Sequence, residues 1–152
     1  MMQTIKLIDV SKSFKSKKAL NNVNIEFKGD RINGLLGPNG SGKTTLFNIV
    51  AGFLSPDNGQ ILLDKYILNN KSLSMRTKQG ISYLPQEASI FRDLTVYDNI
   101  FAIAELFHDK KNSIKMTENL IKQFSLNNFQ KTKGKLLSGG ERRRTEIARA
   151  LA

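Results

Sequence analysis

The feature that most constrains this chain is a glycine-rich octapeptide, Gly37-Pro38-Asn39-Gly40-Ser41-Gly42-Lys43-Thr44. It fits the pattern G-x-x-x-x-G-K-[ST] at every specified position. The segment before it, 31–36, contains three large aliphatic residues, and helically spaced apolar residues follow it: Leu46, Ile49, Val50 and Phe53. A strand, a phosphate-binding loop and a helix are therefore predicted in that order.

The residue types of this loop suit a nucleotide's phosphates. Glycines let successive backbone N–H groups point into one concavity, and the following helix adds the positive end of its dipole. Lys43 supplies a charge for the β- and γ-phosphates, Thr44 offers a hydroxyl to Mg²⁺, and Thr45 can contact the α-phosphate. The alternative is a tight glycine turn that precedes a lysine by coincidence, but the predicted strand and helix argue against it.

Further elements follow from hydrophobic spacing. Partial or strict alternation and short apolar runs predict strands over four segments: 5–10, 23–27, 60–63 and 81–84. Two helices are predicted over 96–107 and 114–124. The segment 138–141 opens a third, with Ile147, Ala148 and Leu151 on one face. Thr95-x-x-Asp98 and Ser138-x-x-Glu141 have the pattern of helix N-terminal capping boxes.

Composition limits the remaining function classes. The 152 residues contain no cysteine and only one histidine, His108, which excludes disulfides, thiolate metal sites and multi-histidine zinc sites. No apolar run is long enough to cross a bilayer and the N-terminus lacks a signal-peptide pattern, so a cytoplasmic protein is expected. The net charge of +11 permits a nucleic-acid partner. The lysines are scattered without interleaved aromatics, so no direct nucleic-acid binding is expected.

Three further segments resemble the motifs of the ATP-binding cassette (ABC) family. Leu137-Ser138-Gly139-Gly140-Glu141 is similar to the family signature LSGGQ, with glutamate in place of glutamine. Gln86, after Tyr83-Leu84-Pro85, matches the Q-loop, and Phe14 matches the aromatic residue that stacks on adenine. Together with the phosphate-binding loop, the resemblance covers essentially the whole chain.

The resemblance implies an α/β fold, the P-loop NTPase cassette. Its mixed sheet core would carry an N-terminal antiparallel β part and a helical subdomain, incomplete at the C-terminus. The single partial domain, 1–152, would comprise a nucleotide-binding core over 1–86, a helical subdomain over 87–137, and the signature with its helix over 138–152. In this fold the strand before Asp64 belongs to the antiparallel part, so Asp64 is not expected to bind Mg²⁺.

The resemblance also implies ligands and partners. ATP and Mg²⁺ would be the cofactors, with Thr44 and Gln86 near the metal. Gln86 would be the catalytic residue of this chain, sensing Mg²⁺ or the attacking water and reporting to a transmembrane partner. Ser138, Gly139 and Gly140 bare N–H groups at a helix N-terminus, and in the family this segment meets the ATP bound to a second copy in a head-to-tail pair. Transmembrane permease subunits would be further partners. The residues expected to line the groove for such a partner are Phe91, Leu94, Tyr97 and Asn99.

Within the family, residues 83–92, 94–96, 137–144 and 146–151 are similar to ATPases of lipopolysaccharide export. Such a protein would work on the cytoplasmic face of the inner membrane. Three alternatives stay open. They are the ATP-binding subunit of another transporter, such as a branched-chain amino-acid importer, a soluble ABC ATPase acting on ribosomes or DNA, and a non-hydrolysing nucleotide-binding fragment with only an interaction role.

The family's Walker B aspartate, catalytic glutamate and switch histidine lie beyond the signature helix, and no residue here is assigned those roles. We therefore expect the 152-residue chain to hydrolyse no appreciable ATP and to leave apolar surface of an incomplete sheet uncovered. A steady ATPase rate that Lys43→Ala abolishes would refute this expectation.

Overall fold

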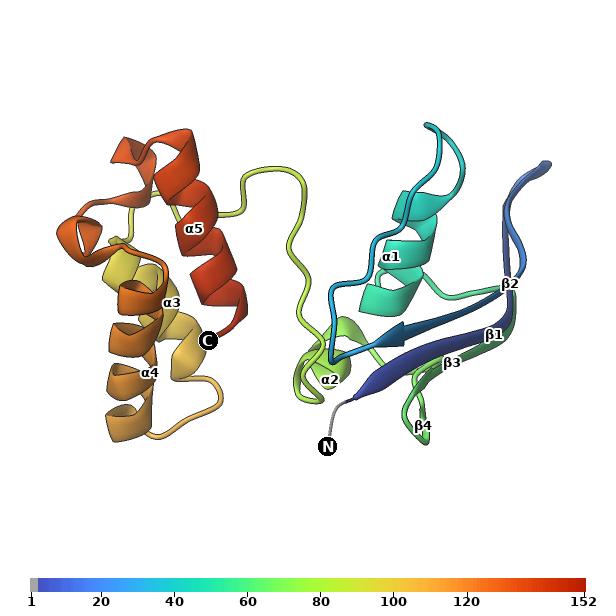
Figure 1. The fold of residues 1–152 in the computed structure, drawn as a ribbon, viewed down its shortest axis with the longest axis horizontal. Helices are drawn as coiled ribbons and strands as arrows, with labels where there is room; N and C mark the ends of the chain where they lie inside the picture. The colour runs from blue at the N-terminus through green and yellow to red at the C-terminus, as the bar shows by residue number, and fades with distance from the viewer. Residues whose placement is uncertain (1–2) are drawn as a thin grey trace. The chain divides into compact units, whose positions relative to one another are not determined.

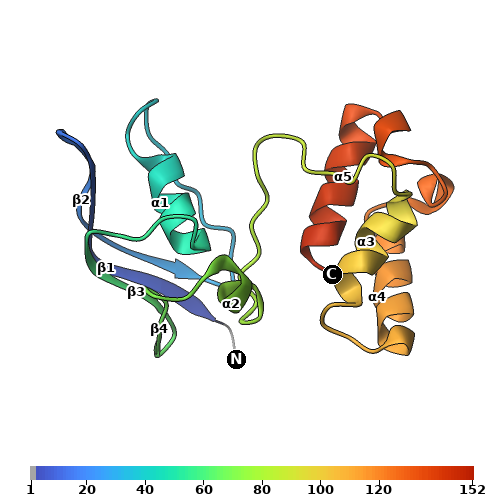
Figure 2. The same cartoon turned by 180° about the vertical axis from the view of Figure 1, so that it is seen from behind.

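The computed structural model describes residues 3–152, which divide into two compact units, one ending at Ile81 and the other spanning Ser82–Ala152. Figures 1 and 2 show the sheet and its helices in the first unit and a group of helices in the second. The units are described separately below. The finer division into 1–86, 87–137 and 138–152 stays a prediction.

The first unit is built on a four-stranded antiparallel sheet in the order β2-β1-β3-β4. Its strands are β1 Thr4–Phe14, β2 Lys17–Lys28, β3 Asn58–Leu63 and β4 Tyr66–Ile67. Leu7 of β1 pairs with Ile25 on one side and Ile61 on the other, so β1 lies inside the sheet. The strands predicted over 5–10, 23–27 and 60–63 are therefore present and extend beyond the predicted bounds.

Helix α1, Lys43–Ala51, packs its apolar side on this sheet (Figure 1). Leu46 and Ile49 are buried in the same core as Leu7 and Ile61. The helix ends at Gly52, which adopts a left-handed conformation with φ 94° and donates its N–H to carbonyls of the last turn. This stop comes before Phe53, which is 51% exposed and not part of the buried helical face that its spacing predicts. The short helix α2, Leu73–Thr77, follows β4.

Two predicted strands do not form. Residues 31–36 and 81–84 are irregular, and neither segment pairs with another strand among residues 3–152. A strand exists only when a second segment satisfies its N–H and C=O groups, whatever its own propensity. Ile32 and Leu36 are accordingly 100% and 93% exposed, which agrees with the expected uncovered apolar surface. The only named sheet in the described chain is antiparallel, and the predicted mixed core is absent from it.

The second unit is helical. Its helices are α3 Val96–Ala104, α4 Lys110–Gln123 and α5 Gly139–Ala150, with 3₁₀ turns at Asn127–Phe129 and Gly134–Leu136. Val96, Ile100, Leu120, Ile121 and Ala148 meet in one buried core. Helix α3 begins at the predicted cap, where the Thr95 hydroxyl accepts the N–H of Asp98 and donates to the Asp98 carboxylate, so the predicted capping box is only half formed. The helix ends three residues earlier than predicted.

The other two helices also differ in detail from their predicted bounds and faces. Helix α4 begins four residues earlier than predicted because the Asp109 carboxylate accepts the N–H of Asn112 and caps it. In α5, Thr145, Glu146 and Ala148 form the buried face, while Leu151 lies past the helix and is 53% exposed, contrary to the prediction. Among residues 3–152, no helix is both long and apolar enough to cross a membrane.

Candidate functional site

The loop between Leu36 and α1 contains glycines in backbone conformations that other residues rarely adopt. Gly40 and Gly42 adopt left-handed conformations with φ 80° and 93°. A side chain at Gly42 is excluded for two reasons: the backbone is left-handed there, and a Cβ would lie 2.5 Å from the carbonyl oxygen of Ala19. The glycines of the octapeptide are thus required by geometry at this point, as the sequence pattern indicates.

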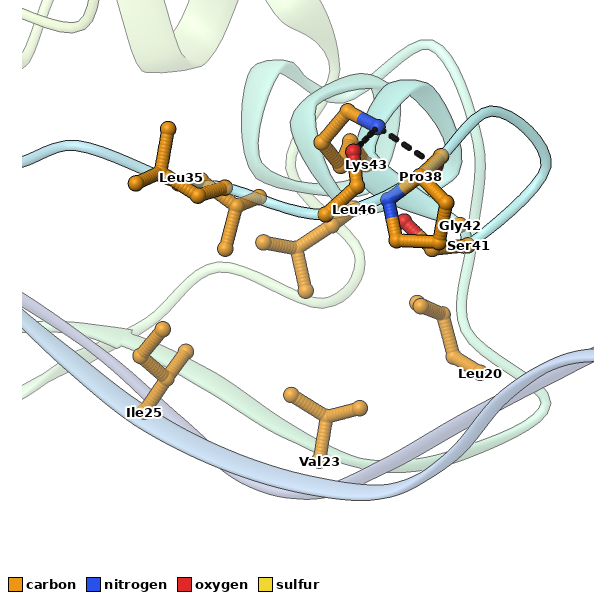
Figure 3. Close-up of a pocket in the computed structure, with 11 residues that line it drawn as sticks. Leu20, Val23, Ile25, Leu35, Pro38, Ser41, Gly42, Lys43 and Leu46 are labelled. Atoms are coloured by element: carbon orange, nitrogen blue, oxygen red, sulfur yellow. Dashed lines mark hydrogen bonds between the residues drawn. The ribbon is translucent and has the colours of Figure 1, made fainter.

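Lys43 holds the two ends of the loop together. Its Nζ donates hydrogen bonds of 2.6 and 2.7 Å to the carbonyl oxygens of Gly37 and Pro38 (Figure 3). Lys43 is also the first residue of α1, whose N-terminus no side chain caps. A cation therefore lies beside an uncapped helix N-terminus, which is a donor set for an anion. Thr44 next to it is exposed, so its hydroxyl is open to a ligand.

An apolar cavity of about 300 Å³ lies beneath this loop. Figure 3 shows Leu20, Val23 and Ile25 of β2 on one side, facing Leu35 and Leu46 on the other. Such walls offer phosphate oxygens no hydrogen bonds, so the cavity itself is not the anion site. Ser41 and Lys43 contribute the polar side chains that line this cavity.

Phe14 lies at the end of β1 with its ring 46% exposed, which suits a stacking role. The Nζ of neighbouring Lys12 lies 5.8 Å from the ring centroid and 2.6 Å from a carboxylate oxygen of Asp57. The second Asp57 oxygen accepts the N–H of Ser13 at 2.7 Å, so the strand end that carries Phe14 is fixed. The hydrogen bond from Lys12 lowers the pKa of the Asp57 carboxyl.

Asp64 has a structural role in the sheet. It lies in the turn between β3 and β4 at φ 52°, and its carboxylate accepts the N–H of Thr4 at 2.8 Å. Its strand is antiparallel to β1, as the family resemblance implies. Its observed partner is thus the start of β1, and no group of three or more His, Cys, Asp or Glu side chains that could hold a metal occurs among residues 3–152.

The signature segment starts α5 with a complete capping box. The Ser138 hydroxyl accepts the N–H of Glu141 at 3.4 Å, and the Glu141 carboxylate accepts the N–H of Ser138 at 2.8 Å. This last hydrogen bond lowers the pKa of the Glu141 carboxyl. A Cβ at Gly139 or Gly140 would meet nothing within 4 Å, so both glycines present bare backbone to the outside. The capping prediction is confirmed, and the glycines leave room for a ligand or a second molecule.

Helix α5 also holds the segment around Gln86, which is exposed. Glu146 is only 3% exposed, and its Oε1 accepts the N–H groups of Ser89 at 2.7 Å and Ile90 at 3.2 Å. Arg143 donates to the carbonyl oxygen of Pro85 at 2.9 Å and to Glu146 at 3.3 Å. The signature helix and the residues on both sides of Gln86 therefore form one hydrogen-bonded network. Sequence reasoning missed it, although the i, i+3 charge pair Arg143–Glu146 was a visible signal.

A partner groove at the four predicted residues stays a prediction, and one of the four is wrongly assigned. Phe91 and Leu94 are 46% and 39% exposed, and the Arg149 guanidinium lies 4.7 Å from the Phe91 ring centroid. Tyr97 is half-buried and stacks on Phe101 with centroids 5.6 Å apart.

Asn99, by contrast, is fully buried and cannot line a groove. Its amide accepts the N–H of Phe91 at 2.9 Å and donates to the carbonyl oxygens of Phe91 and Thr95 at 3.0 and 2.9 Å. These hydrogen bonds fix the backbone of the loop between Phe91 and Thr95.

The predicted site residues fall into two groups. Phe14 and the loop 37–45 belong to the first unit, whereas Gln86 and the signature belong to the second. The loop has left-handed glycines directly before α1, and the signature has the predicted helix cap. A common role of Thr44 and Gln86 at one Mg²⁺ stays a prediction, as do the assignments of all these residues to nucleotide binding.

Comparison with known proteins gives the family. The family model described as "ABC transporter" matches residues 20–152. The chain is 44% identical over 146 residues to the lipopolysaccharide export system ATP-binding protein LptB of Haemophilus influenzae, covering 95% of this chain and 61% of that protein. The protein of the same name from Escherichia coli K12 is 41% identical over 99% of this chain and 64% of its own length. The chain thus spans less than two thirds of these curated relatives.

Solved structures agree with the fold. An ATP-binding cassette of an ABC transporter in its ADP conformation has a TM-score of 0.81 and 29% identity, covering 99% of this chain and 65% of that one. A dimeric cassette in a post-hydrolysis state, bound to ADP and Pi, has a TM-score of 0.82 and 29% identity over 97% of this chain and 69% of its own. Together with the loop and signature geometry, these matches show that the chain belongs to the ABC transporter family.

Proposed function

We propose that this chain binds ATP with its phosphates in the cradle of residues 37–45. The observation that carries the proposal is the Lys43 ammonium bonded across two loop carbonyls beside an uncapped helix N-terminus. Phosphate oxygens can take the backbone N–H groups of the loop and the α1 dipole, while Lys43 turns toward their charge. Phe14, exposed at the end of β1, supplies the ring for the adenine.

Mg²⁺ is the second proposed ligand. The hard oxygen donors that suit this ion are the hydroxyl of Thr44 and the side-chain carbonyl of Gln86, with phosphate and water completing its shell. Bound there, the ion would neutralise charge on the terminal phosphates. Thr44 is exposed at the start of α1, as that role requires.

The signature segment is proposed to close over the ATP of a second copy. Ser138 caps α5, and Gly139 and Gly140 leave its N-terminal backbone bare. An anion held by one copy can therefore approach these N–H groups on another. The similar dimeric cassette bound to ADP and Pi supports a two-copy arrangement. Nucleotide would then stabilise the closed pair, and its loss would release it.

The whole protein is proposed to power lipopolysaccharide export as a peripheral ATPase on the cytoplasmic face of the inner membrane. Support comes from the two relatives of that name, which the chain resembles at 41 and 44% identity. Transmembrane permease subunits would contact the surface around Phe91 and Leu94, both of which are exposed. Hydrolysis would need the catalytic carboxylate that no residue of this chain is assigned to supply.

Nucleotide binding is tested by titrating the full chain with ATP and MgCl₂. Lys43→Ala removes one charge from the loop, whereas Lys78→Ala removes one from an exposed site after α2. A hydrogen bond to a charged group contributes about 1.5–3 kcal/mol, so Lys43→Ala should weaken ATP binding by roughly 10- to 100-fold. Lys78→Ala should bind as wild type. Absence of magnesium-dependent ATP binding in the unaltered chain would refute the proposal.

The transport role needs a different experiment. The full chain, expressed with an affinity tag, should co-purify from membranes with permease subunits of a lipopolysaccharide exporter. Co-purification with an importer's permease, with ribosomes or with DNA would instead support the corresponding alternative.

A further inference from the structure

Arg76 of α2 is an arginine in the core of the first unit. It is 1% exposed, and its guanidinium donates four short hydrogen bonds to backbone carbonyls. Two go to the last turn of α1, to Ile49 at 2.6 Å and Val50 at 2.7 Å. The other two go to the chain after β4, to Leu68 at 2.6 Å and Lys71 at 2.9 Å.

This charge has no ion-pair partner among the described residues, because Arg76 occurs in none of the salt bridges there. Burial lowers the pKa of the Arg76 guanidinium, and no neighbouring carboxylate counteracts it. What compensates the charge is a ring of carbonyl dipoles, two of them at the negative end of α1. A buried charge held in this way depends on the position of every carbonyl around it.

The end of α1 is shaped to receive this side chain. A Cβ at Gly52 would lie 3.0 Å from Nε and 3.1 Å from Cδ of Arg76. Gly52 therefore serves two purposes, since it ends the helix in a left-handed conformation and leaves the space through which the arginine passes. The guanidinium therefore packs directly against the C-terminal end of α1.

The opposite end of α1 is the proposed phosphate site. The helix has nine residues, from Lys43 to Ala51, and rises about 1.5 Å per residue, so the two ends are on the order of 12 Å apart. A hydrogen-bonded helix of this length moves largely as a rigid body. Any shift or rotation at Ile49 and Val50 therefore also displaces Lys43 and the loop before it.

We propose that Arg76 is a positioning residue for nucleotide binding, which it serves by fixing α1, and hence the phosphate cradle, from the far end of the helix. This rests on the proposed binding of ATP at residues 37–45. Arginine suits the task because its planar fork donates in several directions at once, to α1 and to the 68–71 segment together. A lysine ammonium on a flexible stem does not impose that geometry.

The test uses Arg76→Met and Arg76→Lys in the full chain, with Leu63→Ala as the matched control. Leu63 is 3% exposed in the same core, so its truncation destabilises the unit without touching α1's C-terminal carbonyls. The first measurement is the Kd for MgATP well below each variant's melting temperature. The second is the NMR amide shifts of Gly40 and Gly42 without nucleotide.

Arg76→Met should raise the Kd roughly tenfold, a size typical of coupling between two places in one protein, and should move both glycine amides. Arg76→Lys should raise the Kd less than Arg76→Met does. It keeps the positive charge and serves as the test variant if Arg76→Met fails to fold. Leu63→Ala should melt earlier with an unchanged Kd. Wild-type Kd and shifts in both Arg76 variants, or equal weakening in Leu63→Ala, would overturn the inference. Failure of the unaltered chain to bind ATP would instead refute the proposed function itself.

Discussion

Removing the Glu146 carboxylate should release the segment that follows Gln86 from the signature helix. In the structure this carboxylate, 3% exposed, accepts the N–H groups of Ser89 and Ile90 and pairs with Arg143. Glu146→Ala leaves those N–H groups without their acceptor.

Breaking a buried charged pair typically costs about 3–5 kcal/mol. Arg143 is 43% exposed and retains its bond to the Pro85 carbonyl, so the lower end, about 3 kcal/mol, is expected for Glu146→Ala. Because about 1.4 kcal/mol corresponds to a factor of ten, local opening at Ser89 and Ile90 should become roughly a hundredfold more frequent.

Native-state amide hydrogen exchange at Ser89 and Ile90 measures this opening directly. Glu146→Gln keeps an acceptor oxygen but loses the charge, so its exchange rates should fall between those of wild type and Glu146→Ala. Glu118→Ala makes the same chemical change on the exposed side of α4. Its free energy of unfolding should stay within about 0.5 kcal/mol of the wild-type value. Equal exchange at both amides in Glu146→Ala and Glu118→Ala would show that the network does not hold this segment.

Three further perturbations test other parts of the structure. Gly59→Ala should reduce the free energy of unfolding by on the order of 3 kcal/mol and so lower the melting temperature, because Gly59 has φ 89° and a Cβ there would lie 2.5 Å from the backbone of β1. An unchanged melting curve would contradict this expectation. Asn99→Ala should destabilise its unit by about 2–3 kcal/mol in urea denaturation and speed amide exchange at Phe91, whose N–H it accepts; normal protection there would refute the role. The capping box should loosen in acid. The folded-state pKa of Glu141 is lowered by the N–H of Ser138, so its stabilisation is complete above the unfolded value of about 4.3 and disappears as pH falls through the lower folded value. An NMR titration of the Ser138 amide should show this, and a flat profile would contradict it.

Local hydrogen bonding explains which elements could be predicted from the sequence. The N-cap at Thr95 and the capping box at Ser138 connect residues three apart, so their sequence pattern specifies the local geometry. The phosphate loop is likewise local, since left-handed glycines and a lysine at the start of a helix are all within one short segment. The alternation in 23–27 was sufficient to predict a strand, because side chains on the buried face of a strand recur every two residues.

The features that sequence reasoning missed depend on residues far apart in the chain. Segments 31–36 and 81–84 have strand-like composition, yet they stay irregular because no second segment among residues 3–152 pairs with them. Asn99 was predicted to line a surface groove, but its amide is buried and hydrogen-bonded to the backbone of Phe91.

The same reason applies to the buried charges. Arg76 and Glu146 look like ordinary surface charges in the sequence, and they become core residues only where distant carbonyls or N–H groups converge on them. The sequence by itself thus determined the phosphate loop, the helix caps and the alternating strands, whose hydrogen bonds or periodicity are local. Only the tertiary structure decided which polar side chains fix those parts in place, because burying a charged or amide group is stable only when partners from elsewhere in the chain surround it.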